Sequence, residues 1–284
     1  MRTVFVPTDF SDASLVALKY AVEIAQTAGA DLVLYSAVHL PPPVADLGAI
    51  AAPPPADDLM EDTRKALSGL AKELEAHTTQ RIDVVVELGL ASDCIATWME
   101  EHRPWLTVMA SKGTTGLERV VWGSVTRHVA EHAPTPVLVL PETYAYEPIE
   151  SVLYATDFQL GDESVTRYLM DWVADPTELK VHFVHVVDGA VPMEFEESHL
   201  AEFETHMGQI APSPQLSFDL KPGRRVAETL ESEIAAGTWN LVVVCPQHRS
   251  WLLRLFAPSV SNQLVEQLDL PILVHPGSPT GNAH

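Results

Sequence analysis

The chain has 284 residues, a length that suits two domains better than one. Hydrophobic residues make up 46% and charged residues 20% of the chain, which is a globular composition and excludes a disordered protein. Its 17 basic and 39 acidic residues give a net charge of −22, which argues against nucleic acid and membranes as partners.

The cysteine content and the N-terminus bear on the compartment. Cys94 and Cys245 are too few for a disulfide framework and suit a reducing environment. The first residues reach Pro7 and Asp9 too early for a signal peptide, and no apolar run approaches the about 18 residues of a membrane helix. We therefore expect a cytoplasmic protein.

Short apolar runs alternate with helical periodicity in the first half. The expected strands cover residues 3–6, 32–35, 84–86, 106–109 and 137–140. The expected helices run from the N-cap Ser11 to Gly29 and over residues 67–74, 92–102 and 124–132. Strands that alternate with helices require crossovers, so the pattern predicts an α/β fold with a parallel, doubly wound sheet. Two proline clusters between residues 41 and 55 indicate an exposed loop, either a spacer or a lid.

The pattern starts again after residue 150. Val152–Phe158 repeats Phe5–Phe10, which places Asp157 at the position of Asp9. Further repeats are Val181–Val187, Lys221–Gly223, Leu241–Val244 and Ile272–Val274, which match the second strand, the Leu88–Gly89 pair, the fourth strand and the fifth strand. A duplication explains these matches together. We expect two tandem domains, residues 1–145 and 150–280, each with a five-stranded parallel sheet flanked by helices and joined by a polar linker.

A glycine-containing segment after the fourth strand is the candidate anion site. It reads Ala110-Ser111-Lys112-Gly113-Thr114-Thr115-Gly116 and then reaches Gly123-Ser124-Val125, where a helix begins. Glycine lets main-chain amides approach an oxyanion, and a helix N-terminus favours negative charge. Lys112, Arg119 and Arg127 add positive charge. The alternative is a tight turn followed by a capped helix.

Ligands of open parallel sheets bind at the carboxyl ends of strands that diverge. Asp9 ends the first strand and could face the glycine segment across such a crevice. The sequence contains no G-x-x-x-x-G-K-[ST] motif, and no G-x-G-x-x-G follows its first strand. Neither a P-loop enzyme nor a Rossmann dehydrogenase is therefore indicated.

Three segments resemble the universal stress protein family. They are Phe5–Ser11, the loop in which nine residues separate Gly113 from Gly123-Ser124, and Ala133–Val139. The resemblance covers nearly the whole chain as a tandem-domain member and implies the adenine nucleotide alpha hydrolase-like fold. Family members that carry the pattern G-x2-G-x9-G-[ST] bind ATP.

The resemblance implies an ATP site in the first domain, with Mg²⁺ as a candidate companion. Asp9 would contact the adenosine, and backbone near Ala37 would line the adenine pocket. Gly113, Gly123 and Ser124 would hold the phosphates through bare main-chain amides. The full predicted set is Pro7, Thr8, Asp9, Ala37, Ala110, Lys112, Gly113, Gly116, Gly123, Ser124 and Val125.

The chain departs from the family pattern in both halves. Ala110 replaces the first glycine and adds a methyl group near the ligand, which we expect to weaken binding rather than abolish it. In the second half Cys245, His248 and Pro258 occupy the three glycine positions, and only Ser259 agrees. The resemblance therefore implies the fold but no ATP site there, although Arg249 and Arg254 in the same segment could attract another anion.

Metal binding and catalysis are weakly indicated. Cys245 and His248 have a C-x-x-H spacing without further nearby ligands, and His182 and His185 should project to opposite faces of a strand. We predict no metal site and no catalytic residue, since no nucleophile–base pair emerges. At most, Asp9 and Lys112 would support weak ATP hydrolysis.

The primary hypothesis is an ATP-binding stress-response protein that acts through ligand-dependent conformation or association. The alternatives are a nucleotide-free interaction scaffold and a slow ATP hydrolase. By resemblance, the two domains should pair through Val137–Leu140 and Ile272–Val274, which would cover two exposed sheet edges. A homodimer of whole chains stays open.

Overall fold

The computed structural model describes residues 2–40, 55–111, 122–142, 144–158, 161–173, 175–187, 189–211, 215–223, 226–245 and 270–276. The expected proline-rich loop and most of the glycine segment, residues 41–54 and 112–121, lie outside these ranges, as do His248, Arg249, Arg254, Pro258 and Ser259. No helix in the described ranges is long and apolar enough to cross a membrane.

The described residues alternate strands with helices in both halves. The elements of the first half are β1 (Thr3–Pro7), α1 (Asp12–Ala28), β2 (Asp31–Val38), α2 (Ala56–Leu74), β3 (Ile82–Leu88), α3 (Ala91–His102), β4 (Leu106–Ala110), α4 (Ser124–His132) and β5 (Val137–Leu140). Those of the second half are β6 (Ser151–Ala155), α5 (Gly161–Met170), β7 (Lys180–Val187), α6 (Met193–Ile210), β8 (Gln215–Pro222), α7 (Val226–Ala236), β9 (Leu241–Val244) and β10 (Ile272–Val274).

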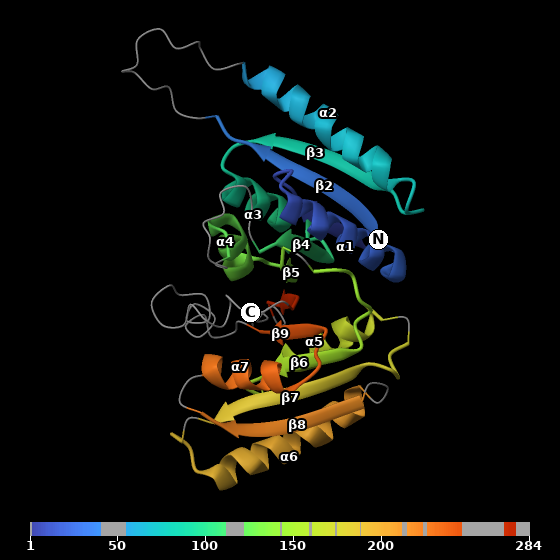
Figure 1. Ribbon diagram of the computed structural model, residues 1–284. Helices are drawn as coiled ribbons and strands as arrows, with labels where there is room; N and C mark the ends of the chain where they lie inside the picture. The colour runs from blue at the N-terminus through green and yellow to red at the C-terminus, as the bar shows by residue number, and fades with distance from the viewer. Residues whose placement is uncertain are drawn as a thin grey trace, which may run out of the picture.

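The strands form one sheet in the order β3-β2-β1-β4-β5-β10-β9-β6-β7-β8 (Figure 1). Strand pairs within each half are parallel, and the order of the second half repeats that of the first. Between the halves β5 and β10 pair antiparallel, with Leu138 opposite Leu273. The α/β fold with mostly parallel strands is therefore confirmed, and the strands that join the halves are the two named from the resemblance.

The boundaries of α1 show how local sequence sets an element. The Ser11 hydroxyl accepts the N–H of Ser14 at 3.2 Å and caps the first turn. Gly29 ends the helix with a φ of 62°, a left-handed conformation in which a side chain would be strained. Between these ends, the helix buries Ala17, Leu18, Ala21 and Val22 against the sheet, among others.

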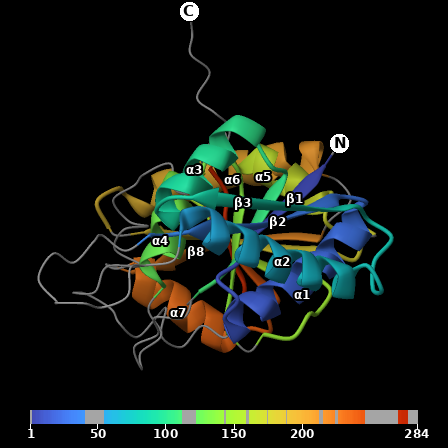
Figure 2. The same cartoon turned by 90° about the horizontal axis from the view of Figure 1, so that it is seen from above.

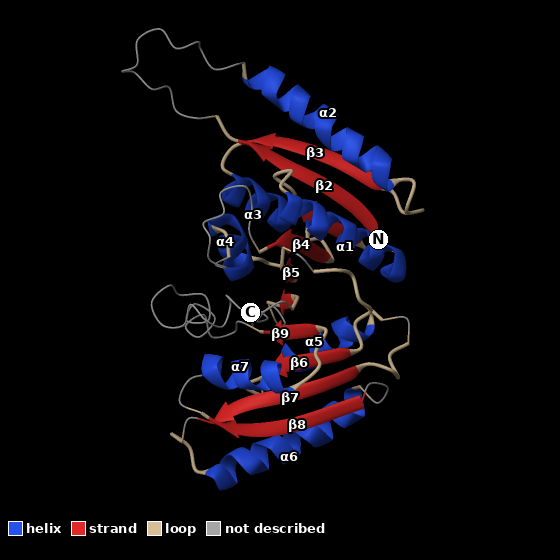
Figure 3. Ribbon diagram, in the orientation of Figure 1, coloured by secondary structure: helices blue, strands red, loops and turns tan. Residues whose placement is uncertain are grey.

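Helices cover both faces of the sheet (Figures 2 and 3). One apolar core lies under α1, α2, α5 and α6, and the other under α3, α4 and α7. The strands beside the junction of the halves, β4, β5, β9 and β10, are buried along their whole length. Parallel strands covered on both faces read as continuous apolar runs, which is why they were visible in the sequence.

The β5–β10 junction should be essential to stability. Leu273 is fully buried in it, so Leu273→Ala is expected to lower the free energy of unfolding by about 2–5 kcal/mol, because the change removes buried methyl groups and leaves a cavity. Urea denaturation measures the effect. Leu88→Ala is the control, since Leu88 is 45% exposed and its loss should cost no more than about 0.5 kcal/mol. Equal losses would contradict a structural role for the junction.

His275 follows β10 and should make the protein sensitive to acid. Burial lowers the pKa of His275 from 6.5 to about 4, so the folded protein keeps a neutral ring that the unfolded chain protonates more readily. The contribution of His275 to the free energy of unfolding is fully present above pH 6.5. We expect the free energy of unfolding to fall by about 3 kcal/mol as the pH drops from 6.5 to 4. Chemical denaturation across this window should show a shallower pH slope for His275→Gln. Identical slopes would refute the assignment.

Candidate functional site

A cavity of about 280 Å³ lies in the first half, where β1, β2 and β4 end and α4 begins. The predicted residues that line it are Pro7, Thr8, Asp9, Ala37, Ala110, Gly123, Ser124 and Val125. The residues that sequence reasoning did not name are Ser14, Tyr35, Ala91, Ile95, Met109 and Thr126. Lys112, Gly113 and Gly116 lie outside the described residues. Segments about a hundred residues apart therefore meet at this crevice, as parallel topology requires.

The apolar part of the cavity rests on an aromatic cluster. The Phe5 and Trp98 rings stack at 4.0 Å, and Tyr35 packs edge-on against Phe5 at 5.2 Å. The Tyr35 hydroxyl donates to Glu87 Oε2 at 2.6 Å. Burial, reinforced by Glu87, raises the pKa of Tyr35 well above its usual value, so this hydroxyl stays protonated as a donor. Ring packing and one hydrogen bond therefore hold Tyr35, which lines the cavity.

A turn after β1 presents the Asp9 carboxylate at the rim. Asp9 Oδ1 accepts the Ser11 N–H at 3.1 Å and the Ser11 hydroxyl at 2.6 Å. Phe10 takes a φ of 62°, and its N–H donates to Thr8 Oγ1 at 3.1 Å. A left-handed phenylalanine is strained, and such conformations gather at ligand sites. The turn thus fixes a charged group beside the cavity.

Two hydrogen bonds tie the start of α4 to the end of β4. The Gly123 N–H donates to the Ser111 carbonyl at 2.7 Å, so this amide has a protein acceptor, and Gly123 still lines the cavity. Nearby, the Thr126 hydroxyl donates to the Ala110 carbonyl at 2.9 Å. The N–H groups of residues 124–126 belong to the first turn of α4, where a helix provides no backbone carbonyl to accept them. Together with the helix dipole, they favour an anion at the cavity.

Of the three basic side chains expected near the glycine segment, the described residues include one. Arg127 lies on the first turn of α4, whereas Lys112 and Arg119 lie outside the described residues. The described part of the site therefore combines one carboxylate, one helix N-terminus and an apolar floor.

The corresponding place in the second half is built differently. Asp162 occupies the position of Ser14, is 1% exposed, and accepts the hydroxyls of Tyr154 and Thr156. Cys245 takes the place of Ala110, and burial raises the pKa of its thiol to about 12. Its Sγ donates to a carbonyl at 3.3 Å. A buried polar network thus replaces the small groups that line the first crevice.

A further cavity of about 470 Å³ lies on the other face of the second half, against α5 and α6. His185 Nε2 lies 3.6 Å from Glu196 Oε2 there, and His206 Nε2 lies 3.5 Å from Glu163 Oε2. His182 points to the opposite face, where it stacks on Trp239, as the strand geometry predicted. Within the described ranges, no three His, Cys, Asp or Glu side chains are arranged to hold a metal ion.

Comparisons with known proteins agree with this architecture. The family model described as the universal stress protein family matches residues 1–141. A universal stress protein of Methanocaldococcus jannaschii is 32% identical over 139 residues, which are 49% of this chain and 81% of that protein. The chain belongs to the universal stress protein family.

Three further similarities bear on how much of the chain the family fold covers. A universal stress protein of Mycolicibacterium smegmatis is 34% identical over 134 residues, or 46% of this chain, and the match spans 43% of that relative. The solved structure of a universal stress protein from Archaeoglobus fulgidus aligns with a TM-score of 0.72 at 17% identity. The alignment covers 97% of this chain and 96% of the Archaeoglobus fulgidus chain. A functionally unknown protein from Pseudomonas aeruginosa aligns with a TM-score of 0.59 at 14% identity, covering 97% and 92%. The universal stress protein fold therefore extends over both halves.

Thr126 should anchor the start of α4 to β4. Its hydroxyl is buried, so Thr126→Val would leave the Ala110 carbonyl without its donor and is expected to cost about 1–3 kcal/mol of unfolding free energy. Thr205→Val is a matched control, because the Thr205 hydroxyl makes a similar bond to a carbonyl on the exposed face of α6. Thermal or urea unfolding reports both. A loss for Thr126→Val no larger than the control's would exclude the anchoring role.

Proposed function

We propose that this universal stress protein binds ATP in the first half only and acts in the cytoplasmic stress response through ligand-dependent conformation or association. The single observation that carries the proposal is the cavity in which the Asp9 carboxylate and the N-terminus of α4 line the same crevice. Family membership supports the stress-response role.

The cavity divides into parts that suit a nucleotide. Apolar side chains from Ile95 and Met109 offer a surface for a flat base, and Ala37 brings main-chain groups beside it. The carboxylate of Asp9 can accept hydrogen bonds from a ribose. The first-turn amides of residues 124–126 can receive phosphate oxygens. Because the Gly123 N–H is hydrogen-bonded to Ser111, we assign phosphate binding mainly to the amides of the first turn of α4.

Tandem domains over residues 1–145 and 150–280 belong to the same proposal. The second half keeps the strained turn, since Phe158 has a φ of 59° and its N–H donates to Thr156 Oγ1 at 2.8 Å. It differs where the ligand would sit, because Asp162 and Cys245 fill the positions of Ser14 and Ala110. A buried carboxylate would repel a phosphorylated ligand. This supports a single nucleotide site per chain.

Calorimetry with ATP at moderate salt tests the proposal. Wild-type protein should bind, and a ligand at a hundredfold excess over its Kd should raise the unfolding free energy by about 2.7 kcal/mol. Asp9→Asn should weaken binding about tenfold or more, since hydrogen bonds to a charged group are lost. Asp157→Asn is the matched control, because Asp157 follows β6 as Asp9 follows β1, and it should bind like wild type.

The other outcomes separate the alternatives. The absence of both heat and thermal stabilisation at millimolar ATP would overturn the proposal and favour a nucleotide-free scaffold. Equal losses for Asp9→Asn and Asp157→Asn would remove the site from the first half. Phosphate release followed over hours decides whether bound ATP is hydrolysed, and repeating the titration with Mg²⁺ decides whether the ion contributes.

A further inference from the structure

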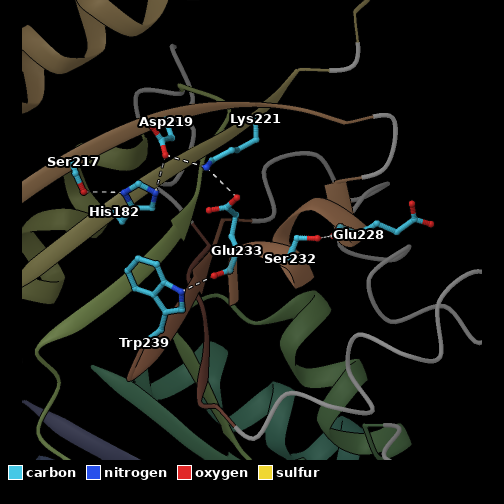
Figure 4. A network of polar contacts seen from close by, with 8 residues as sticks. All are labelled: His182, Ser217, Asp219, Lys221, Glu228, Ser232, Glu233 and Trp239. Atoms are coloured by element: carbon cyan, nitrogen blue, oxygen red, sulfur yellow. Dashed lines mark hydrogen bonds and ion pairs between the residues drawn. The ribbon is translucent and has the colours of Figure 1, made fainter. Parts of the chain in front are cut away.

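The α7 face of the second half carries a polar network (Figure 4). At the corresponding register positions of the first half, Val33 of β2 lies opposite Asp83 of β3. Under α7, the His182 ring of β7 lies between the side chains of Ser217 and Asp219, which both belong to β8. The second half therefore has an imidazole where the first half has a valine side chain.

Sheet geometry brings these three side chains into line. His182 lies directly opposite Ser217 in the β7–β8 register, and Asp219 is two residues further along the same face. Ser217 Oγ lies 2.8 Å from His182 Nδ1, and Asp219 Oδ2 lies 3.5 Å from His182 Nε2. A hydroxyl, an imidazole and a carboxylate in that order are the groups of an activated nucleophile.

Neighbouring groups hold the imidazole and the carboxylate. The His182 ring, whose side chain is 17% exposed, stacks on Trp239 at 5.5 Å. Lys221 Nζ reaches Asp219 at 3.1 Å and Glu233 at 3.0 Å, which fixes the carboxylate beside the ring (Figure 4). Burial lowers the pKa of His182 below 6.5, although Asp219 and Glu233 oppose the shift and Lys221 adds to it. The ring is therefore neutral and able to accept a proton at neutral pH.

The edge of the sheet offers a donor for an oxyanion. β8 ends the strand order, and on its β7 side the N–H groups of Gln215 and Gly223 donate to the Leu179 and Val187 carbonyls at 2.7 and 3.0 Å. Because parallel pairing alternates, the N–H of Phe218 is directed away from β7, at the outer edge and next to Ser217. An amide that follows the nucleophile is well placed to stabilise negative charge on an attacked carbonyl.

We propose that Ser217 is a nucleophile, with His182 as its general base, for acyl transfer from small uncharged carboxylic esters to water. Ser217 Oγ attacks the carbonyl carbon while its proton moves to His182 Nδ1, which requires the tautomer with Nε2–H toward Asp219. The bond to the leaving alcohol then breaks, and the alcohol takes that proton. Water, deprotonated by the same ring, releases the acid and restores Ser217. The surrounding carboxylates disfavour anionic esters.

Covalent labelling of the full chain with a fluorophosphonate, located by mass spectrometry, tests the nucleophile. Wild-type protein should be labelled at Ser217, and Ser217→Ala should lose that label. Ser232→Ala is the matched control, because Ser232 is also exposed but donates only to the Glu228 carbonyl at 3.1 Å, and its variant should label like wild type. His182→Gln should label about a hundredfold more slowly, since the base is missing.

The pH profile distinguishes positioning from a structural effect. Labelling should rise with pH as the imidazole becomes neutral, and Asp219→Asn should slow it and move its midpoint to lower pH, because Asp219 raises the pKa of the ring. Thermal unfolding checks that each variant is folded. Wild-type labelling of Ser217 no greater than that of Ser232, or p-nitrophenyl acetate hydrolysis unchanged in Ser217→Ala, would overturn the proposal. Neither result depends on ATP binding.

Discussion

The antiparallel contact between β5 and β10 is the interaction on which the rest of the molecule depends. Each strand is short, with four and three residues, and each is buried along its length. Unpaired, each would present an apolar edge to solvent. Joined through Leu138 and Leu273, they merge two sheets into one and let α-helices cover a continuous surface. The strands next to β1 and β6, which are β4 and β9, pair on their other edges with β5 and β10.

The two halves share one strand order but differ in their polar side chains. The first half keeps small groups around its crevice, with Ser14 and Ala110 leaving room beside Asp9. The second fills the same place with Asp162 and moves its accessible polar groups to the α7 face, around His182. One scaffold therefore supports a cavity in one half and a surface network in the other, since the core residues under the helices carry the fold in both.

The sequence predicted most of the architecture because its signals are local. The Ser11 cap, the Gly29 terminus and the apolar runs of the central strands are visible without any contact information. Strand ends were short by a few residues, as at Val38, because pairing extends a ladder past its apolar centre. The site was harder. Glu87 reaches the cavity floor only through Tyr35, the Gly123 amide donates to the Ser111 carbonyl, and the Ser217–His182 contact depends on strand register. No local sequence pattern indicates any of these three contacts.

The seam also governs how copies of the chain could meet. Because β5 and β10 pair with each other, the outer strands of the sheet in the described part of the chain are β3 and β8, and strand addition there would use those two edges. A polypeptide that stopped at the linker would instead carry β5 as an open edge. Two such fragments could pair antiparallel through β5 about a two-fold axis, as β5 and β10 pair here, so that the chain resembles a homodimer whose partners have been joined.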